Sequence, residues 1–458
     1  MKNEKRISLT KGGLITFLTS SVIFILAMAS SIILARALGP EGRGIATLTL
    51  MIPPLLVMFG TFGTEVSNVY FAGNKKFKLD DIVSNSIALT ILISIFLFSI
   101  FYIVYRTPFF QNYMSSNMIS PLFLWIAIAS LPFNLLFIFL KNILLGKEHI
   151  GKMNLLGFYQ AFIQLLLVLL FVVVLKLNVL GAVLCFLIGS FICSIISLYY
   201  VSKISDIRLK LNFKLANSSL RYGGKAYIGN LAQFLNYRLD IFLVAYFLNP
   251  AAVGFYGIAV GLAEKLWMVP GSIGTVLFPR VSSINTKEAN KLTPIVARHT
   301  FFSVLVLAII LFIFSKHLIV LLFGKTYLPS VKPLLILLPG VVALSISKIL
   351  TSDLAGRGKP QFGMVASCIS LPINICLNII LIPKWGISGA AFASTIAYWA
   401  ATTVVFIAFL KISKNSLLDI LILKKEDINK YVLPKFKMLR TLLVGAHNTN
   451  EGLHNGRK

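Results

Sequence analysis

Long apolar stretches separated by short polar turns constrain this chain more than any other feature of its sequence. About 20 residues of α-helix cross a hydrocarbon core of roughly 30 Å, and twelve stretches reach that length. Charged residues make up only 13% of the 458 residues, so the chain could not cover its own surface in water. We therefore predict an all-α integral membrane protein. The twelve predicted transmembrane helices are residues 14–38, 45–71, 82–104, 119–140, 153–175, 178–201, 225–247, 251–279, 300–323, 333–352, 362–383 and 385–410.

The distribution of Lys and Arg predicts how these helices are oriented. If the N-terminus is cytoplasmic, the connections on the cytoplasmic side contain 32 of the 43 Lys and Arg residues, and the outer connections contain 8. Basic residues concentrate on the cytoplasmic side of membrane proteins, and an even number of helices returns the chain to its starting side. We therefore expect both termini in the cytoplasm. Contact with the anionic inner leaflet explains the net charge of +28 without a nucleic-acid partner.

A ten-residue motif occurs twice in the chain. Residues 35–44 (ARALGPEGRG) and residues 245–254 (AYFLNPAAVG) both fit A-x-x-L-x-P-x-x-x-G, 210 residues apart. In each copy Pro starts a helix and Gly permits a tight turn. We predict two six-helix lobes of the same orientation, related by a pseudo-twofold axis along the membrane normal. Two further turns recur at similar offsets, residues 146–147 with 356–357 and residues 176–182 with 384–390.

The repeat divides the chain into four parts. We expect an N-terminal lobe at residues 1–202 and a cytoplasmic linker at residues 203–224, with Gly223-Gly224 as a hinge. The C-terminal lobe should occupy residues 225–411. Residues 412–458 should form a basic cytoplasmic tail, because they contain no stretch long enough to span a membrane.

The first motif, residues 35–44, resembles the signature at the first outer turn of bacterial polysaccharide (Wzx-type, O-antigen) flippases. Residues 236–240 (NYRLD) and 274–280 (GTVLFPR) are similar to the seventh and eighth helices of that family. The resemblance covers residues 1–411. It extends to the wider superfamily of multidrug, oligosaccharidyl-lipid and polysaccharide exporters, which also contains the multidrug (MATE) exporters and lipid II flippases.

This resemblance implies twelve helices in two lobes around a central cavity. It also implies transport of polyprenyl-diphosphate-linked oligosaccharide repeat units across the bacterial inner membrane by alternating access, for O-antigen, capsule or exopolysaccharide synthesis. The expected partners are this substrate, membrane lipids, a proton or sodium ion for coupling, and the polysaccharide polymerase and glycosyltransferases of the same biosynthetic system.

Six charged residues lie within the predicted helices, where an ionisable group is costly unless it faces a cavity or a partner. We predict that the three basic residues bind the anionic diphosphate of the substrate, and that the three acidic residues serve in coupling. The alternative is that these charges form permanent ion pairs that fix the packing, in which Arg238 would pair with Asp240 of a rotated neighbouring turn or with Glu264 of another helix. The basic residues are Arg238, Lys265 and Lys348, and the acidic residues are Glu65, Asp240 and Glu264.

The seventh predicted helix also carries a polar face. At 100° per residue, Asn230, Gln233, Tyr237 and Asp240 share a stripe about 80° wide. Arg238 lies about 160° away from Asp240, so the two side chains do not pair within the helix. We predict that Asn230, Gln233 and Tyr237 line a wet lumen and contact the substrate.

Other functional classes fit the sequence less well. A membrane enzyme should carry catalytic groups on a large outer loop, but the longest outer connection, residues 105–118, contains one charge and no His, Asp or Glu. No phosphate-binding loop of the form G-x-x-x-x-G-K-[ST] is present. The four cysteines lie inside apolar stretches and lack metal-ligand spacing. We therefore expect no enzymatic activity, no cofactor and no metal site.

A cation- or proton-coupled multidrug antiporter of the MATE type is the alternative function, because it has the same architecture. Many members of that branch carry an acidic residue in the first helix, whereas residues 14–35 contain none. Lipid II flippases commonly have two further helices, which the tail cannot supply. The sequence therefore favours the polysaccharide branch.

Overall fold

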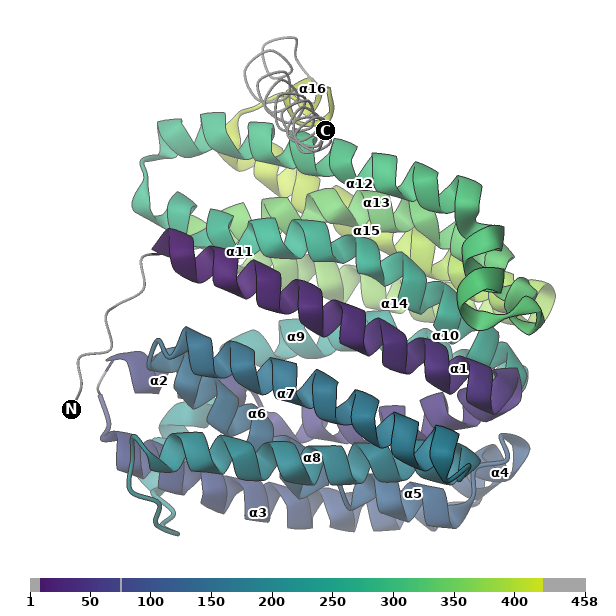
Figure 1. Cartoon of the computed structure of the whole chain (residues 1–458). Coiled ribbons are helices and arrows are strands. Elements are labelled where there is room, and N and C mark those ends of the chain that lie inside the picture. Colours follow the sequence, from purple (N-terminus) through teal and green to yellow (C-terminus); the bar gives the residue numbers. More distant parts are fainter. Residues whose placement is uncertain (1–8, 75, 423–458) are drawn as a thin grey trace, which may run out of the picture.

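The computed structural model describes residues 9–74 and 76–422, and within them every regular element is a helix (Figure 1). The part of the predicted tail beyond residue 422 lies outside the described residues. The N-terminal half contains α1 (Leu9–Thr61), α2 (Thr64–Asn74), α3 (Leu79–Tyr105), α4 (Pro108–Ser116), α5 (Pro121–Ile128), α6 (Leu131–Gly146), α7 (Ile150–Val168), the π-helix η1 (Leu169–Val174) and α8 (Asn178–Ser202). The C-terminal half contains α9 (Phe213–Phe247), α10 (Pro250–Glu264), the 3₁₀-helix η2 (Lys265–Trp267), α11 (Met268–Ser283), α12 (Thr286–Phe323), the 3₁₀-helix η3 (Lys325–Ser330), α13 (Val331–Gly356), α14 (Gln361–Trp385), α15 (Ile387–Ser413) and α16 (Leu417–Leu421).

A turn divides α1 into two helices. Gly39 has φ 66° and ψ 178°, a conformation that residues with a Cβ rarely adopt. Pro40 follows, and its fixed φ suits the first turn of the helix that begins there. The chain reverses at this point, so α2 lies at the same end of the molecule as the beginning of α1 (Figure 1). This turn coincides with the first of the two sequence motifs.

Ten helical segments of the described chain are long and apolar enough to cross a membrane. One of them, Leu18–Thr61, contains the turn at Gly39 and therefore covers two of the predicted transmembrane helices. The predicted helix at residues 225–247 is absent from the ten. It lies within α9, which has 35 residues but carries the polar stripe that lowers its hydropathy.

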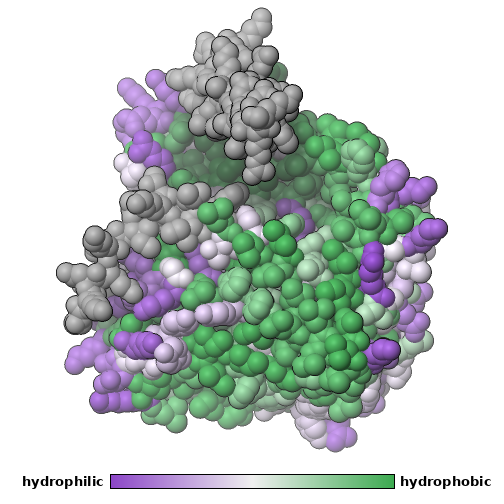
Figure 2. Space-filling view, in the orientation of Figure 1, coloured by the Kyte–Doolittle hydropathy of each residue, from purple (hydrophilic) through white to green (hydrophobic). Residues whose placement is uncertain are grey.

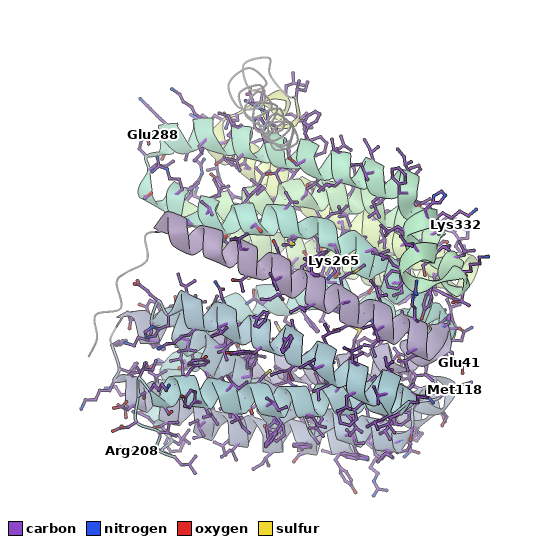
Figure 3. The ribbon with its side chains drawn as sticks, in the orientation of Figure 1. Glu41, Met118, Arg208, Lys265, Glu288 and Lys332 are labelled. Atoms are coloured by element: carbon purple, nitrogen blue, oxygen red, sulfur yellow. The ribbon has the colours of Figure 1, made fainter. Side chains whose placement is uncertain are left out.

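The long helices run side by side between two ends of the molecule, and the first part of α1 passes between the two halves (Figure 1). We name the ends by their connections. The basic end carries Arg208 and Glu288, and the short-turn end carries Glu41, Met118 and Lys332 (Figure 3). Between them the visible surface is a broad apolar belt, with hydrophilic residues gathered at both ends (Figure 2). This distribution is the one expected of a protein surrounded by lipid.

The connection between the halves is shorter and more firmly attached than predicted. The linker was expected at residues 203–224, but α9 begins at Phe213, where the Asn212 side chain accepts a hydrogen bond from Leu215 N. The Asp80 carboxylate accepts hydrogen bonds from Ser205 Oγ (2.7 Å) and Asp206 N (3.0 Å). Residues 203–212 are therefore fastened to the first turn of α3, and Gly223-Gly224 lies inside a helix.

The cores of the two halves pack through apolar and small residues. α13 is the central helix of the C-terminal half and packs against α10, α11, α12 and α15. A Cβ built on Gly340 of α13 would lie 2.8 Å from Thr395 Cα of α15. Small residues allow such close approach of helices where lipid provides no hydrophobic driving force for association. The expected outer loop at residues 105–118 instead contains helix α4, which Thr107 caps through its side chain.

Candidate functional site

The centre of the candidate site is an ion pair between α9 and the end of α10. Arg238 donates to both carboxylate oxygens of Glu264, with Nη1–Oε1 2.8 Å and Nη2–Oε2 3.0 Å. The two side chains are 32% and 18% exposed. A two-point contact of this kind fixes the orientation of the guanidinium as well as its charge. Of the two acidic partners considered for Arg238, Asp240 and Glu264, the structure pairs it with Glu264.

Lys348 of α13 lies against the aromatic residues next to this ion pair. Its Nζ is 4.8 Å from the ring centre of Trp267 and 5.5 Å from that of Tyr237. These two rings and that of Tyr398 are mutually in contact, with centre-to-centre distances of 4.9–5.9 Å. Aromatic faces attract a cation electrostatically. The site therefore holds a second positive charge that has no carboxylate partner among the described ion pairs.

Asp240 belongs to a separate and fully buried group. Its side chain is only 1% exposed. One carboxylate oxygen accepts hydrogen bonds from Tyr256 Oη (2.6 Å) and Ser394 Oγ (3.0 Å), and the other accepts from Ile241 N (2.8 Å). The end of the predicted stripe thus turns away from solvent, because α9 packs there against α10 and α15.

The remaining part of the predicted stripe is accessible. Asn230 and Gln233 are exposed, and Tyr237 is half-buried. Gln233 Nε2 donates to Tyr237 Oη at 3.3 Å. These side chains form a polar strip along α9 that continues from the aromatic cluster toward the basic end.

Sequence reasoning did not identify a row of amides between α9 and α14. Asn236 Nδ2 donates to Ser370 Oγ (3.1 Å), and Asn378 Nδ2 donates to Asn374 O (2.9 Å). Asn236 Oδ1 and Asn378 Oδ1 are buried and accept no hydrogen bond from any described residue. The signal was present in the sequence, since Ser370, Asn374 and Asn378 recur every four residues within an apolar stretch.

The other two predicted residues lie outside this cluster. Lys265 is exposed, and its Nζ lies 5.2 Å from the ring centre of Phe24 in α1. It is placed midway between the two ends (Figure 3). Glu65 is on α2, where its buried Oε2 has no hydrogen-bond partner among the described residues.

The two halves touch at the short-turn end through the two copies of the motif. A Cβ built on Gly44 would lie 1.7 Å from Pro250 O, and one built on Gly254 would lie 2.1 Å from Pro40 O. Each glycine therefore meets the proline of the other copy. Tyr327 Oη also donates to Ala35 O at 2.9 Å.

A guanidinium reinforces the contact at the short-turn end. Arg36 Nε donates to Leu322 O at 2.8 Å, and its Nη2 donates to Leu321 O. These carbonyls belong to the last turn of α12, where they have no partner within the helix. The contact therefore joins α1 to α12 as well as to α10.

At the basic end the two halves touch where the end of α1, the turn at Gly63 and α2 meet α9. A Cβ built on Gly223 would lie 2.1 Å from Gly63 O. The Tyr70 and Tyr222 rings stack at 4.1 Å with 12° between their planes. Tyr227 Oη donates to Phe59 O at 3.2 Å. The charged cluster of α9 and α10 therefore lies between two contacts that join the halves.

This arrangement suits the binding of an anionic group. The site offers positive charge and aromatic faces at mid-length of the helices. Within residues 9–74 and 76–422, no group of three His, Cys, Asp or Glu residues could hold a metal ion.

The sequence matches the model of a known protein family over most of its length. Residues 33–332 match the model of a family described as polysaccharide biosynthesis protein. A Haloferax volcanii protein named as a low-salt glycan biosynthesis flippase, Agl15, is 27% identical over 221 residues, 46% of this chain and 45% of that protein. A Shigella flexneri protein named as an O-antigen transporter is 24% identical over 383 residues, 81% of this chain and 90% of that protein. The chain thus spans about half the length of the first of these relatives and most of the second.

Solved structures share the fold. The lipid II flippase MurJ in an inward closed conformation superposes with a TM-score of 0.75 at 18% identity, covering 88% of this chain and 91% of that one. An inward-facing multidrug transporter of the MATE family superposes with a TM-score of 0.64 at 15% identity, covering 87% and 98%. At sequence identities this low, the superpositions establish only that the fold is shared.

Proposed function

The chain belongs to the polysaccharide biosynthesis protein family, and on that premise we propose that it is a flippase for lipid-linked oligosaccharides. It would carry polyprenyl-diphosphate-linked repeat units across the bacterial inner membrane for O-antigen, capsule or exopolysaccharide synthesis. The named relatives are flippases and transporters, in agreement with the prediction that the chain is not an enzyme. The observation that carries the proposal is the two-point clamp of Arg238, which holds a carboxylate in the geometry that would hold a phosphate.

In this proposal, the diphosphate exchanges with Glu264 on Arg238. Lys348 adds a second charge from its place against Trp267, and Lys265 adds a third near α1. The sugars would lie along Asn230, Gln233 and Tyr237, whose amide and hydroxyl groups donate and accept hydrogen bonds. The transported headgroup would thus be neutralised and hydrogen-bonded while it is removed from water.

We assign the coupling role to the acidic residues. Protonation of Glu264 would release Arg238 to the diphosphate. Asp240, held by Tyr256 and Ser394, would respond to a proton or sodium ion, and Glu65 would do so in the N-terminal half. Alternating access would follow from opening and closing of the two contacts between the halves.

We propose twelve transmembrane helices in two lobes related by a pseudo-twofold axis along the membrane normal. The turn at Gly39 and the length of α9 support this number. The reciprocal contacts of the two motifs support the symmetry, as does a pair of internal contacts. A Cβ built on Gly181 would lie 2.9 Å from Phe171 O, and one on Gly389 would lie 2.2 Å from Leu381 O.

We further propose that the basic end and both termini are cytoplasmic. The excess of Lys and Arg at this end supports that orientation. Reporter fusions after Lys203 and Lys414 should report a cytoplasmic location, and fusions near Gln111 and Asn249 should report the outside. An outside signal at Lys203 would contradict both the orientation and the division into six plus six helices.

The test of the function is a mutant series at the clamp, measured as surface polysaccharide per unit of membrane-inserted protein. Arg238→Ala should abolish export, and Arg238→Lys should retain part of it through its point charge. The double variant Arg238→Ala/Glu264→Gln should remain inactive if Arg238 binds substrate. Recovery of export in that double variant would mean that Arg238 only neutralises Glu264.

A multidrug antiporter remains the second candidate, because the MATE transporters share the fold. Deletion of the gene should remove surface polysaccharide and leave drug susceptibility unchanged. Increased drug accumulation with normal surface polysaccharide would favour the antiporter.

A further inference from the structure

The predicted transmembrane helix at residues 119–140 ends just before Lys141, but in the structure Lys141 lies within a helix. Lys141 lies in α6, five residues before the last residue of that helix at the basic end. At 1.5 Å per residue its Cα is about 7 Å inside that end. The helix packs against α1, α2, α3, α7 and α8, so Lys141 belongs to the packed helices of the N-terminal half rather than to a surface loop.

The side chain of Lys141 points away from the nearer end of the helix. Its Nζ lies 5.5 Å from the ring centre of Phe137, one turn farther from the basic end. Lysines near a membrane surface normally extend toward that surface and its water. Lys141 instead carries its charge deeper into the bundle, where an ammonium needs a compensating partner.

Helices α1, α6 and α7 all contribute to the space around this ammonium. The nearest atoms to a Cβ built on Gly157 of α7 are Ile23 Cδ1 of α1 (3.1 Å) and Lys141 Nζ (4.0 Å). Lys141 is half-buried and takes part in none of the described ion pairs. A cation held between α1, α6 and α7 beside a residue without a side chain is suited to receive an external anion.

Helix α1 places this cation in relation to the site already described. Ile23 is near Lys141 Nζ, and the next residue, Phe24, lies under Lys265 Nζ at 5.2 Å. Lys265 comes from the C-terminal half, midway between the ends (Figure 3). Neighbouring residues of α1 thus lie near one lysine from each half.

We infer that Lys141 is a further anion-binding residue, which receives a phosphate group of the substrate from the N-terminal half, in addition to the basic residues proposed in the other half. The inference rests on the proposed function, and the ligand is a phosphate ester.

The test uses the purified full-length protein and two probes, a polyprenyl diphosphate and vesicles containing phosphatidylglycerol. Lys141→Gln should weaken binding of the polyprenyl diphosphate about tenfold, the size of one charge-assisted hydrogen bond. Lys141→Arg should bind within about threefold of the unaltered protein, because it keeps the charge. Export in cells should fall with Lys141→Gln in the same proportion.

Lys203 supplies a matched control. It follows α8 at the basic end, and its Nζ lies 4.0 Å from the ring centre of Tyr199, four residues earlier, but its side chain is exposed. Lys203→Gln should bind the diphosphate as the unaltered protein does. An equal loss in Lys203→Gln and Lys141→Gln would overturn the site, because the effect would then come from net charge.

Two other outcomes would overturn the inference. Weaker binding of phosphatidylglycerol with unchanged binding of the polyprenyl diphosphate would assign Lys141 to a lipid headgroup. Full export by Lys141→Gln, together with loss of export by Arg238→Ala, would remove Lys141 from the site and leave the proposed function intact. Unchanged polysaccharide after deletion of the whole gene would instead contradict the proposed function.

Discussion

The two contacts between the halves differ in how they are built. At the short-turn end the contact is reciprocal, since Gly44 meets Pro250 and Gly254 meets Pro40, and a tyrosine and an arginine add hydrogen bonds. At the basic end one residue pair makes the contact, since a Cβ built on Gly223 would lie 2.1 Å from Gly63 O and one built on Gly63 would lie 2.4 Å from Gly223 O, and stacked and tilted aromatic rings cover it. The first contact fixes two helical turns against each other from both sides, whereas the second depends on one close approach.

This difference indicates which end opens more easily. Separating the short-turn end would break two backbone contacts and the hydrogen bonds of Arg36, and it would leave the buried hydroxyl of Tyr327 without its partner, which is costly. Separating the basic end would break one backbone contact, one hydrogen bond from Tyr227 and the aromatic contacts. We therefore expect the basic end to open first.

The largest effect should follow from a side chain at the short-turn contact. In Gly44→Ala the new Cβ would lie 1.7 Å from Pro250 O, so the two helices must move apart. We expect a loss of about 3 kcal/mol in the free energy of unfolding, the upper range for overpacking, and loss of export. Thermal unfolding of the purified protein measures the first and surface polysaccharide measures the second.

Gly261→Ala is the matched control for this change. Gly261 is in α10, and a Cβ built there meets no atom within 4 Å. Its substitution should be neutral or slightly stabilising, because Ala favours the helix over Gly by about 1 kcal/mol. Equal unfolding temperatures for Gly44→Ala and Gly261→Ala would show that the reciprocal contact does not hold the halves together.

A smaller effect is expected from Gly223→Ala at the basic end. Its Cβ would lie 2.1 Å from Gly63 O, which should separate α2 from α9 and shift the protein toward the state open at this end. Export should fall because closure becomes unfavourable by about 1–3 kcal/mol. The accessibility of this end can be measured with a cysteine that replaces Phe62 after the four native cysteines are removed. A polar thiol reagent should label this cysteine faster in the Gly223→Ala variant than in the protein that keeps Gly223.

The neighbouring residue tests whether the contact or the glycine itself is responsible. A Cβ built on Gly224 meets no atom within 4 Å, so Gly224→Ala should leave labelling at position 62 unchanged. If Gly224→Ala and Gly223→Ala accelerate labelling equally, the helix rather than its contact with Gly63 controls the opening.

Removal of one aromatic contact should have a still smaller effect. Tyr222→Ala removes the ring that stacks on Tyr70 at 4.1 Å, an interaction of about 1 kcal/mol. Labelling at position 62 should therefore rise about fivefold, whereas Tyr222→Phe should stay near the original rate. No change in Tyr222→Ala would mean that the stack forms without stabilising the closed end.

The smallest effect is expected from removal of the end of the tail. Helix α16 packs on α12, where Ile420 is buried and Arg298 Nη1 donates to Asp419 O at 2.8 Å. Truncation after residue 425 keeps this attachment, so export should stay nearly unchanged. Loss of surface polysaccharide at normal protein abundance would assign the tail a part in transport.

The sequence predicted the fold well because length and hydropathy are local properties of each helix. The turn at Gly39 followed from the succession of Gly and Pro, and Glu264 was one of two partners considered for Arg238. Hydropathy does not determine how a helix is rotated about its axis or how closely two helices approach. For this reason the burial of Asp240, the position of Lys141 within α6 and the amides of α14 emerged only from the structure.

The reciprocal contact of the two motifs also bears on the origin of the chain. Two identical subunits that meet about a twofold axis make contacts of this kind, in which residue i meets j and j meets i. Joining such subunits into one polypeptide makes their association intramolecular and frees each copy to change without altering the other. The 210-residue offset that relates the motifs carries Arg238 to Met28, Glu264 to Pro54 and Lys348 to Ile138. The charged residues of the clamp therefore have uncharged residues at the positions 210 residues earlier.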